Sequence, residues 1–354
     1  MDATSPHTQK YCRWIDIAKG IAMISVIASH TVIPGGRLHH FFYLYEIPLF
    51  FFLSGITFNP KPWKVLLTSS IRRLLLPYLL LCVILLAPNI FNDPSPSNAV
   101  TQALVALYGG GWTVMPFGFP GIGTAWFLLA LFSARILANA LFGWFERDKV
   151  SSFTQYALVL ILAIAGKWIP THLCWLPLDI DVAFVAVWYL FIGWRCKRYG
   201  MAPSLPGFRG PHDKDRDRLV AVIITILLLC LGTWCSRLTV FSPGARGYGS
   251  TRIFLFCLFC STGMSMAFCI AAHAIDNHTR VLGAPACQHL VFMGKYSMLA
   301  FVLLCIDGRF VQWRNLGLYA MPYGHVILSV IRVAYISLFM LLLLLTSPAI
   351  GKRE

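Results

Sequence analysis

Apolar runs of about 20 residues alternate with short polar connections along most of the chain. Runs of this length are typical of helices that cross a bilayer, because a helix satisfies its own backbone hydrogen bonds where lipid offers no partners. We therefore predict an all-α integral membrane protein with a single transmembrane domain over residues 1–354. Ten spans are expected, at approximately 15–33, 41–58, 72–91, 122–145, 153–169, 174–194, 219–240, 252–274, 287–306 and 325–348.

The composition agrees with this pattern. Hydrophobic residues make up 58% of the chain and charged residues 12%, whereas soluble domains carry about 25% charged residues. A net charge of +15 would suit a nucleic-acid-binding protein. However, the Lys and Arg residues lie between apolar runs and do not form patches interleaved with aromatic residues. We expect contact with the lipid bilayer and none with nucleic acid.

The connections differ strongly in basic residues. The tail 1–14 and the loop 195–218, which reads RCKRYG and then HDKDRDR, lie on the side that holds most of the Lys and Arg residues. Because cytoplasmic connections are rich in these residues, both termini are predicted to be cytoplasmic. The connection 92–121 on the opposite side has no Lys or Arg and is expected to form a re-entrant or interfacial loop.

Ionisable side chains at membrane depth are default candidates for a site. At 100° per residue, Lys19 lies about 20° and Asp16 about −40° from His30, so the three share one stripe of the first helix. Glu46 of the second helix stands at a depth similar to that of His30, each a few residues from the turn between them. A carboxylate bonded to one imidazole nitrogen would leave the other as a base toward a hydroxyl.

Simpler interpretations exist for each candidate. His30 could be a packing histidine, and Glu46 could be an interfacial residue. Asp179 and Asp181, predicted on opposite faces of one helix, are alternative acids for His30, and so is Asp307. An ion pair between Asp307 and Arg309 would explain both of these residues. The C-x-x-C formed by Cys257 and Cys260 lacks a histidine or a second cysteine pair, so we expect no metal.

Several segments resemble the membrane-bound acyltransferase family 3, which includes O-acetyltransferases of bacterial surface polysaccharides. The segment RWIDIAKGIAMISVIASH is similar to the opening pattern of the family, and Lys19 and His30 keep its spacing. IPLFFFLSGITF, RRLLLPYLL and, more diffusely, TAWFLLALF, PLDIDVAFVAVWYLFIG and GKYSMLAFVLL follow in order. The chain departs from the family at Glu46, where related sequences often have His, and at 302–305, which read VLLC where many relatives have a His.

The resemblance implies a membrane O-acyltransferase of the bacterial inner membrane. It implies acetyl-CoA as the donor on the cytoplasmic side and a hydroxyl of a cell-surface, exported or lipid-linked glycan as the acceptor, with polysaccharide-assembly proteins as further partners. His30 would deprotonate the hydroxyl while Glu46 orients the imidazole, and the basic residues Arg13, Lys19, Arg72 and Arg73 would hold the CoA phosphates.

Two other functions fit the same pattern of polar residues. One is a transporter or flippase for a glycan or lipid carrier, in which intramembrane His and Glu would couple protons. The chain shows no internal repeat, which counts against it. The other is a non-catalytic scaffold of a polysaccharide export complex, in which the polar stripe of the first helix would have no purpose.

Overall fold

The computed structural model describes residues 12–111, 120–198, 226–235, 237, 241–277 and 283–346. Regular structure in these ranges is helical, apart from an isolated bridge between Ser242 and Gly247. The helices and helical turns, in chain order, are α1 (Arg13–Ser29), α2 (Arg37–Ile56), α3 (Trp63–Ser70), η1 (Ile71–Leu75), α4 (Leu76–Asn92), α5 (Pro96–Tyr108), η3 (Gly123–Ala125), α6 (Trp126–Arg147), α7 (Ser152–His172), η4 (Pro177–Asp179), α8 (Ile180–Arg198), the segment Ile226–Cys235, η5 (Pro243–Ala245), α10 (Thr251–Asn277), α12 (Ala284–Lys295), α13 (Ser297–Phe310), η6 (Trp313–Asn315), η7 (Gly317–Ala320) and α14 (Gly324–Thr346).

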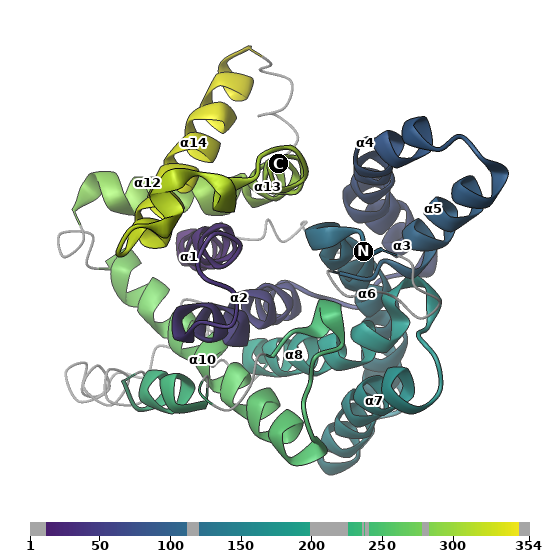
Figure 1. The fold of residues 1–354 in the computed structure, drawn as a ribbon. Helices are drawn as coiled ribbons and strands as arrows, with labels where there is room; N and C mark the ends of the chain where they lie inside the picture. Colours follow the sequence, from purple (N-terminus) through teal and green to yellow (C-terminus); the bar gives the residue numbers. More distant parts are fainter. Residues whose placement is uncertain are drawn as a thin grey trace.

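Helix α1 occupies the interior of the bundle. It packs against α2, α10, α12, α13 and α14, as Figure 1 shows. Residues in the middle of α1, such as Ile17, Ala22 and Met23, are fully buried. The surrounding helices therefore fix the position of α1, and with it the positions of the side chains at its ends.

Glycines allow two pairs of helices to cross closely. A Cβ at Gly20 of α1 would overlap the carbonyl of Leu290 in α12, and a Cβ at Gly294 of α12 would overlap the carbonyl of Asp16 in α1. Gly55 of α2 and Gly193 of α8 approach the partner helix backbone in the same way. Small residues at helix crossings are typical of membrane proteins, because association there depends on close van der Waals packing.

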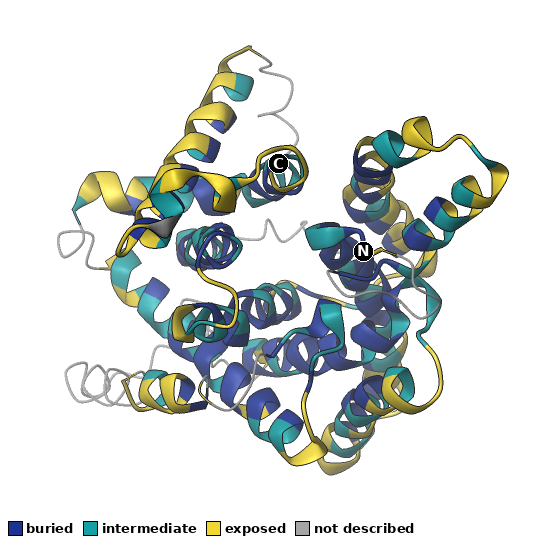
Figure 2. Cartoon of the chain, in the orientation of Figure 1, coloured by how far each residue is buried: buried dark blue, intermediate teal, exposed yellow. Residues whose placement is uncertain are grey.

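The outer surface of the bundle is apolar. Buried residues concentrate in the central helices, and the outward faces of α4, α7 and α14 are exposed (Figure 2). Exposed residues of these faces include Leu80, Val83, Ile161, Val330 and Leu345. Apolar faces of this extent would be unfavourable in water and suit contact with lipid tails. The chain is a multi-pass membrane protein.

Six helical segments of the described residues are long and apolar enough to cross a bilayer, or seven if the bent pair α12 and α13 counts as one span. Helix α1 has 17 residues, just short of a full apolar span, and α2 carries Arg37, His39, His40 and Glu46 among its apolar residues. Ten spans and cytoplasmic termini therefore stay predictions. Most of the loop 195–218 and part of the segment 219–240 lie outside the described residues.

Two of the predicted elements differ in their regularity from what the sequence indicated. Residues 92–121 were predicted as a loop, but Pro96–Tyr108 forms the helix α5, with the Ser95 side chain accepting a hydrogen bond from the Asn98 amide at its start. The predicted span 287–306 bends by 77° between α12 and α13. The bend follows Gly294, whose close contact with α1 fixes the direction of α12.

Candidate active site

His30 ends α1 and faces a cavity of about 930 Å³. Its Nδ1 lies 2.8 Å from the Val26 carbonyl oxygen. Because a carbonyl can only accept, Nδ1 must carry the proton in this contact, and in the neutral ring Nε2 is then the nitrogen with a free lone pair. The arrangement fits a general base, since the protonated nitrogen is anchored to the helix and the other is available to a hydroxyl.

A serine links His30 to Glu46. The Ser29 Oγ lies 3.1 Å from His30 Nδ1 and donates to Glu46 Oε1 at 3.1 Å. Glu46 is 1% exposed, and its second oxygen, Oε2, has no hydrogen-bond partner among the described residues. The structure thus places Glu46 at the depth of His30, as the hairpin predicts. The predicted contact between carboxylate and imidazole is replaced by a bridge through the Ser29 hydroxyl.

A buried ion pair holds the same end of α1. Arg332 of α14 contacts Asp307 of α13 at 2.6 Å and donates from Nη1 to the His30 carbonyl oxygen and to Thr31 Oγ1, both at 3.2 Å. Trp313 Nε1 donates to Asp307 Oδ1 at 2.9 Å. Arg332 therefore joins α1, α13 and α14 beside the cavity that it helps to line.

The prediction of an ion pair between Asp307 and Arg309 was wrong. Arg309 instead donates from Nη2 to Asn89 Oδ1 of α4 at 2.7 Å. Residues 307 and 309 are two apart on one helix and so point about 200° apart, which directs them to different neighbours. Arg332 did not enter the predicted site, although an arginine within the apolar run 325–348 is a signal that could have identified it.

Asp179 and Asp181 lie in a separate cluster. Both contact Arg246, at 2.7 and 3.0 Å, and all three side chains are buried. The prediction that the two carboxylates occupy opposite faces was wrong, because Leu178 and Asp179 have φ of 59° and 51° and Asp179 precedes the α-helix. Neither aspartate lines the cavity at His30.

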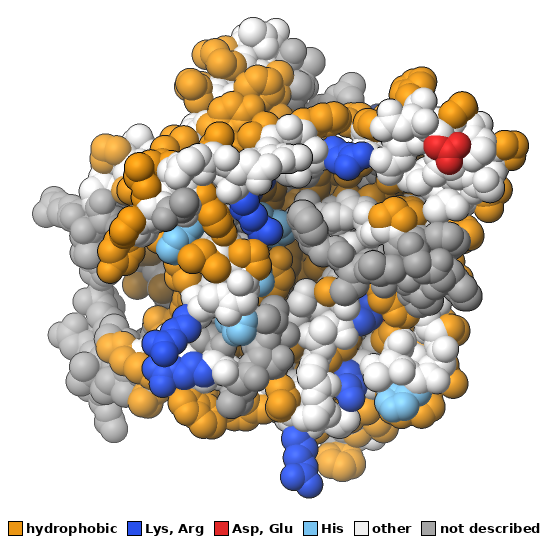
Figure 3. Space-filling view, viewed as in Figure 1, with side chains coloured by type: hydrophobic (Ala, Val, Ile, Leu, Met, Phe, Trp, Pro, Cys, Tyr) orange, Lys and Arg blue, Asp and Glu red, His pale blue; other side chains and the backbone are white. Residues whose placement is uncertain are grey.

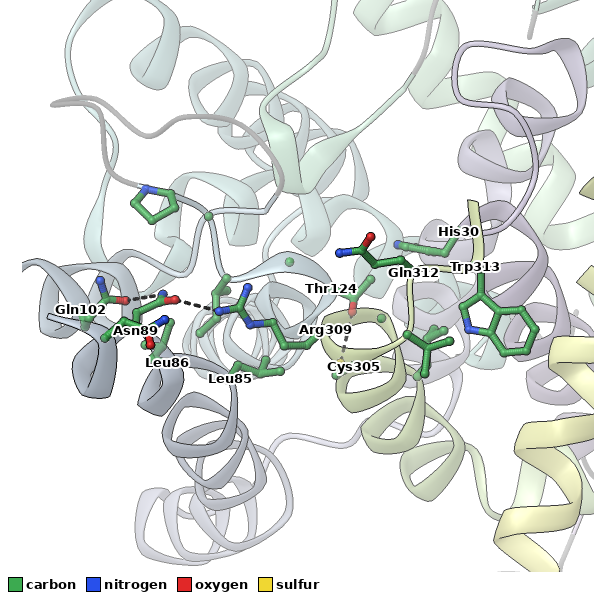
Figure 4. A pocket seen from close by; sticks show the side chains of 18 of the residues that line it. His30, Leu85, Leu86, Asn89, Gln102, Thr124, Cys305, Arg309, Gln312 and Trp313 are labelled. Atoms are coloured by element: carbon green, nitrogen blue, oxygen red, sulfur yellow. Dashed lines mark hydrogen bonds between the residues drawn. The ribbon is translucent and has the colours of Figure 1, made fainter. Parts of the chain in front are cut away.

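The wall of the cavity opposite His30 is rich in amides. Arg309 donates to Asn89, Asn89 Nδ2 donates to Gln102 Oε1 at 3.1 Å, and Gln102 Nε2 donates to Asn98 Oδ1 at 2.9 Å. Figure 4 shows Asn89 and Gln102 on one side of the cavity and His30, Gln312 and Trp313 on the other, with Arg309 between them. Apolar side chains complete the lining; they include Leu85, Leu86, Ile122 and Leu304.

The four basic residues predicted to bind the donor lie outside this cavity. Arg13 contacts Asp276 of α10 at 3.6 Å, and Lys19 contacts Asp16 at 3.6 Å. At 1.5 Å per residue, Lys19 is about 16 Å along α1 from His30, toward the opposite end of the bundle. Arg72 and Arg73 are exposed on the π-helical turn η1.

Arg73 has a cationic neighbour that the sequence analysis did not identify. It lies close enough to Arg135 of α6 for the two charges to interact. Arg135 donates to Ser54 Oγ at 3.4 Å and stacks over Phe58 at 5.4 Å. One turn further along α6, Asn139 lines a second hollow of about 530 Å³, together with Lys61, Trp63, Trp144 and Arg147. Two guanidinium groups near each other suit the binding of an anion such as a phosphate.

A family comparison shows the class of domain to which these residues belong. A family model described as an acyltransferase domain matches residues 13–346, nearly the whole chain. The chain belongs to acyltransferase family 3. No curated protein matches it. The matched range includes α1 with His30 and α14 with Arg332, so the cavity described above is part of the acyltransferase domain.

Proposed function

We propose that this membrane acyltransferase moves an acetyl group from acetyl-CoA to a hydroxyl of a cell-surface or exported glycan, in the inner membrane of a bacterium. The observation that carries the proposal is the free Nε2 of His30 in a cavity lined with amides. Amide side chains offer both donors and acceptors, which match the hydroxyls of a sugar. The apolar part of the lining suits the less polar faces of the ring and the methyl group of the acetyl.

His30 would act as the general base of the transfer. Its Nε2 accepts the proton of the acceptor hydroxyl while the oxygen attacks the thioester carbonyl. The carbon–sulfur bond breaks, the CoA thiolate leaves and takes up a proton, and the acceptor becomes an ester. Ser29 and Glu46 would hold the imidazole and stabilise its positive charge during the transfer.

The donor would bind at the other end of the bundle. The phosphates of acetyl-CoA need cations, and Arg72, Arg73 and Arg135 carry charge there with two tryptophans in the neighbouring hollow. Arg13 and Lys19 would contribute at the same end of α1. Because that end is also the basic side of the predicted topology, we place it in the cytoplasm.

The test is transfer by the purified protein. We expect label to move from radioactive acetyl-CoA to glycan extracted from the producing cells, with one CoA thiol released per ester formed. His30→Ala should lower the rate by about 10² to 10⁴-fold, the usual contribution of a general base, with the protein still inserted at normal abundance. His172→Ala is the matched control, because His172 is exposed and stacks on Trp168 away from the cavity.

Two results would contradict the proposal. Transfer by His30→Ala at the wild-type rate would remove His30 from the reaction. Movement of glycan or lipid carrier across sealed vesicles, without acceptor-dependent release of CoA, would instead support a transporter.

A further inference from the structure

The charges around the cavity do not balance. Among the described residues that line it, the charged ones are Asp93, Arg309, Arg314 and Arg332. Arg332 is neutralised by Asp307. Asp93 is exposed at the end of α4, where its Oδ1 accepts from the Ser95 amide. Within the described ranges, neither Arg309 nor Arg314 forms an ion pair, which leaves an excess of positive charge in the cavity.

Arg309 is held in place by neutral partners. Its hydrogen bond to Asn89 continues through Gln102 to Asn98, which in turn donates to the carbonyl oxygens of Asn89 at 3.0 Å and Asp93 at 2.6 Å. Each amide donates to the next, so the chain fixes the guanidinium without cancelling its charge. A guanidinium has five N–H donors, and a preorganised one has donors left for a ligand.

The two unpaired arginines lie toward different ends of the cavity. Arg314 is near enough to His30 and Tyr43 to act on both electrostatically. Arg309 bridges α13 and α4, and its guanidinium lies between His30 and the amide wall, toward Asn89 (Figure 4). In the view of Figure 3 a basic patch lies between α13 and α4, and the acidic patch that is visible lies at the corner of α4 and α5.

We infer that the acceptor glycan carries an anionic oxygen group and that Arg309 binds it while a hydroxyl of the same glycan reaches His30. This inference rests on the proposed function and adds the chemical class of the acceptor. A sugar carboxylate and a phosphate both present oxygens that match the guanidinium fork. With a neutral acceptor, the guanidinium of Arg309 would have only neutral partners, and the excess positive charge of the cavity would stay unbalanced.

The experiment compares three forms of one glycan. Glycan extracted from the producing cells is used untreated, after chemical reduction of its carboxyl groups to alcohols, and after removal of its phosphates. We expect one of the two treatments to lower kcat/KM for acetyl transfer at least tenfold, mainly through KM, because an ionic hydrogen bond is lost. An effect of carboxyl reduction would identify a sugar carboxylate as the group that Arg309 binds, and an effect of phosphate removal would identify a phosphate.

Variants assign the effect to Arg309. Arg309→Gln should use the treated and untreated glycans about equally, while Arg309→Lys should keep part of the preference because the charge remains. Both changes replace an exposed side chain, so folding should be preserved. Arg237→Gln is the matched control, since Arg237 is exposed and does not line the cavity.

Failure of the inference can be told apart from failure of the proposed function. Equal use of all three glycans by the wild-type protein, or an unchanged preference in Arg309→Gln, would overturn the inference and leave acetyl transfer intact. Absence of transfer to every glycan would contradict the proposed function. Equilibrium dialysis of the labelled glycans then tests the inference alone, and equal binding by the wild type and Arg309→Gln would overturn it.

Discussion

Ser29 joins two ionisable groups that belong to different helices. Its hydroxyl is within 3.1 Å of both His30 Nδ1 and Glu46 Oε1. Its single proton has two acceptors within reach, the Val26 carbonyl at 2.9 Å and Glu46 Oε1, and its oxygen is a second acceptor, beside the Val26 carbonyl, for the proton on His30 Nδ1. The carboxylate can therefore favour a positive imidazole without touching it. The three side chains form one polar unit at the end of α1 that faces the cavity.

This arrangement predicts that substitution of either Glu46 or Ser29 lowers the rate of acetyl transfer. Glu46→Gln keeps the size of the side chain and a hydrogen bond to Ser29 but removes the charge. We expect kcat to fall about 10²-fold, at the lower end of general acid–base contributions. Ser29→Ala should lower kcat in the same way, because it disconnects the carboxylate from the ring. Both are measured as acetyl transfer per folded protein.

Ser25→Ala is the control for these changes. Ser25 lies one turn earlier on α1 and shares its hydrogen bond with the Tyr45 hydroxyl, at 2.7 Å. It should keep a kcat close to that of the wild type. If Glu46→Gln turned over at the wild-type rate, Glu46 would be a packing residue, and the orienting role would pass to the Arg332 and Asp307 pair.

The depth of His30 and Glu46 in the membrane could be predicted from the sequence, but the side chains that they contact could not. The positions of His30 and Glu46 near one turn follow from counting along two apolar runs. The bridge through Ser29 depends on the rotation of each helix, which the pattern of residues does not determine to within one side chain. Arg332 is 302 residues from His30, so their contact depends on how α1 and α14 pack.

Among the elements, α1 and α12 show how close packing sets the geometry of the site. Gly20 and Gly294 let the two helices cross with their backbones in contact. The chain then turns by 77° into α13, which carries Cys305 and Arg309 to the cavity. The placement of these side chains therefore depends on the two glycines, Gly20 and Gly294, which have no Cβ.

Adding a methyl group at this crossing should be costly. In Gly294→Ala the Cβ would overlap the Asp16 carbonyl, and in Gly20→Ala it would overlap that of Leu290. Because backbone cannot move aside as a flexible side chain does, we expect a loss of about 1–3 kcal/mol, typical of overpacking. Thermal unfolding in detergent should show the loss as a lower Tm.

Gly143→Ala provides the matched control in α6. Its Cβ would meet only the Pro60 side chain, at 3.9 Å, which is ordinary contact. Since Ala is the better helix former, Tm should stay the same or rise. A Tm for Gly294→Ala equal to that of Gly143→Ala would show that α12 can shift along α1.

The elements differ in how far they could be predicted. Most predicted spans coincide with a helix, because runs of about 20 apolar residues leave few alternatives in a bilayer. Helix α5 was not predicted, because it mixes polar and apolar residues without a long apolar run and reads PSNAVTQALVALY. The bend at Tyr296 falls within the segment GKYS, which interrupts the apolar run only briefly and so did not indicate a break.

Considered as a whole, the molecule separates two kinds of chemistry along α1. One end carries His30, the amide wall and the buried Arg332 ion pair. The other carries Arg13 and Lys19, and the exposed Arg73 lies close to Arg135. The proposed reaction brings a charged donor and a polar acceptor to one base from opposite sides of the membrane. Their two sites should therefore respond independently to substitution.

Arg72 and Arg73 test this separation. Arg72→Ala with Arg73→Ala removes two exposed charges from η1, where CoA phosphates are proposed to bind. The KM for acetyl-CoA should rise about tenfold or more, as expected for the loss of ionic hydrogen bonds, with little change in the KM for glycan. Lys149→Gln, an exposed cation in the turn between α6 and α7, should change neither value. If donor affinity is unchanged in correctly inserted protein, the two arginines act as orientation signals, and the donor site must be sought at Arg13, Lys19 or Arg135.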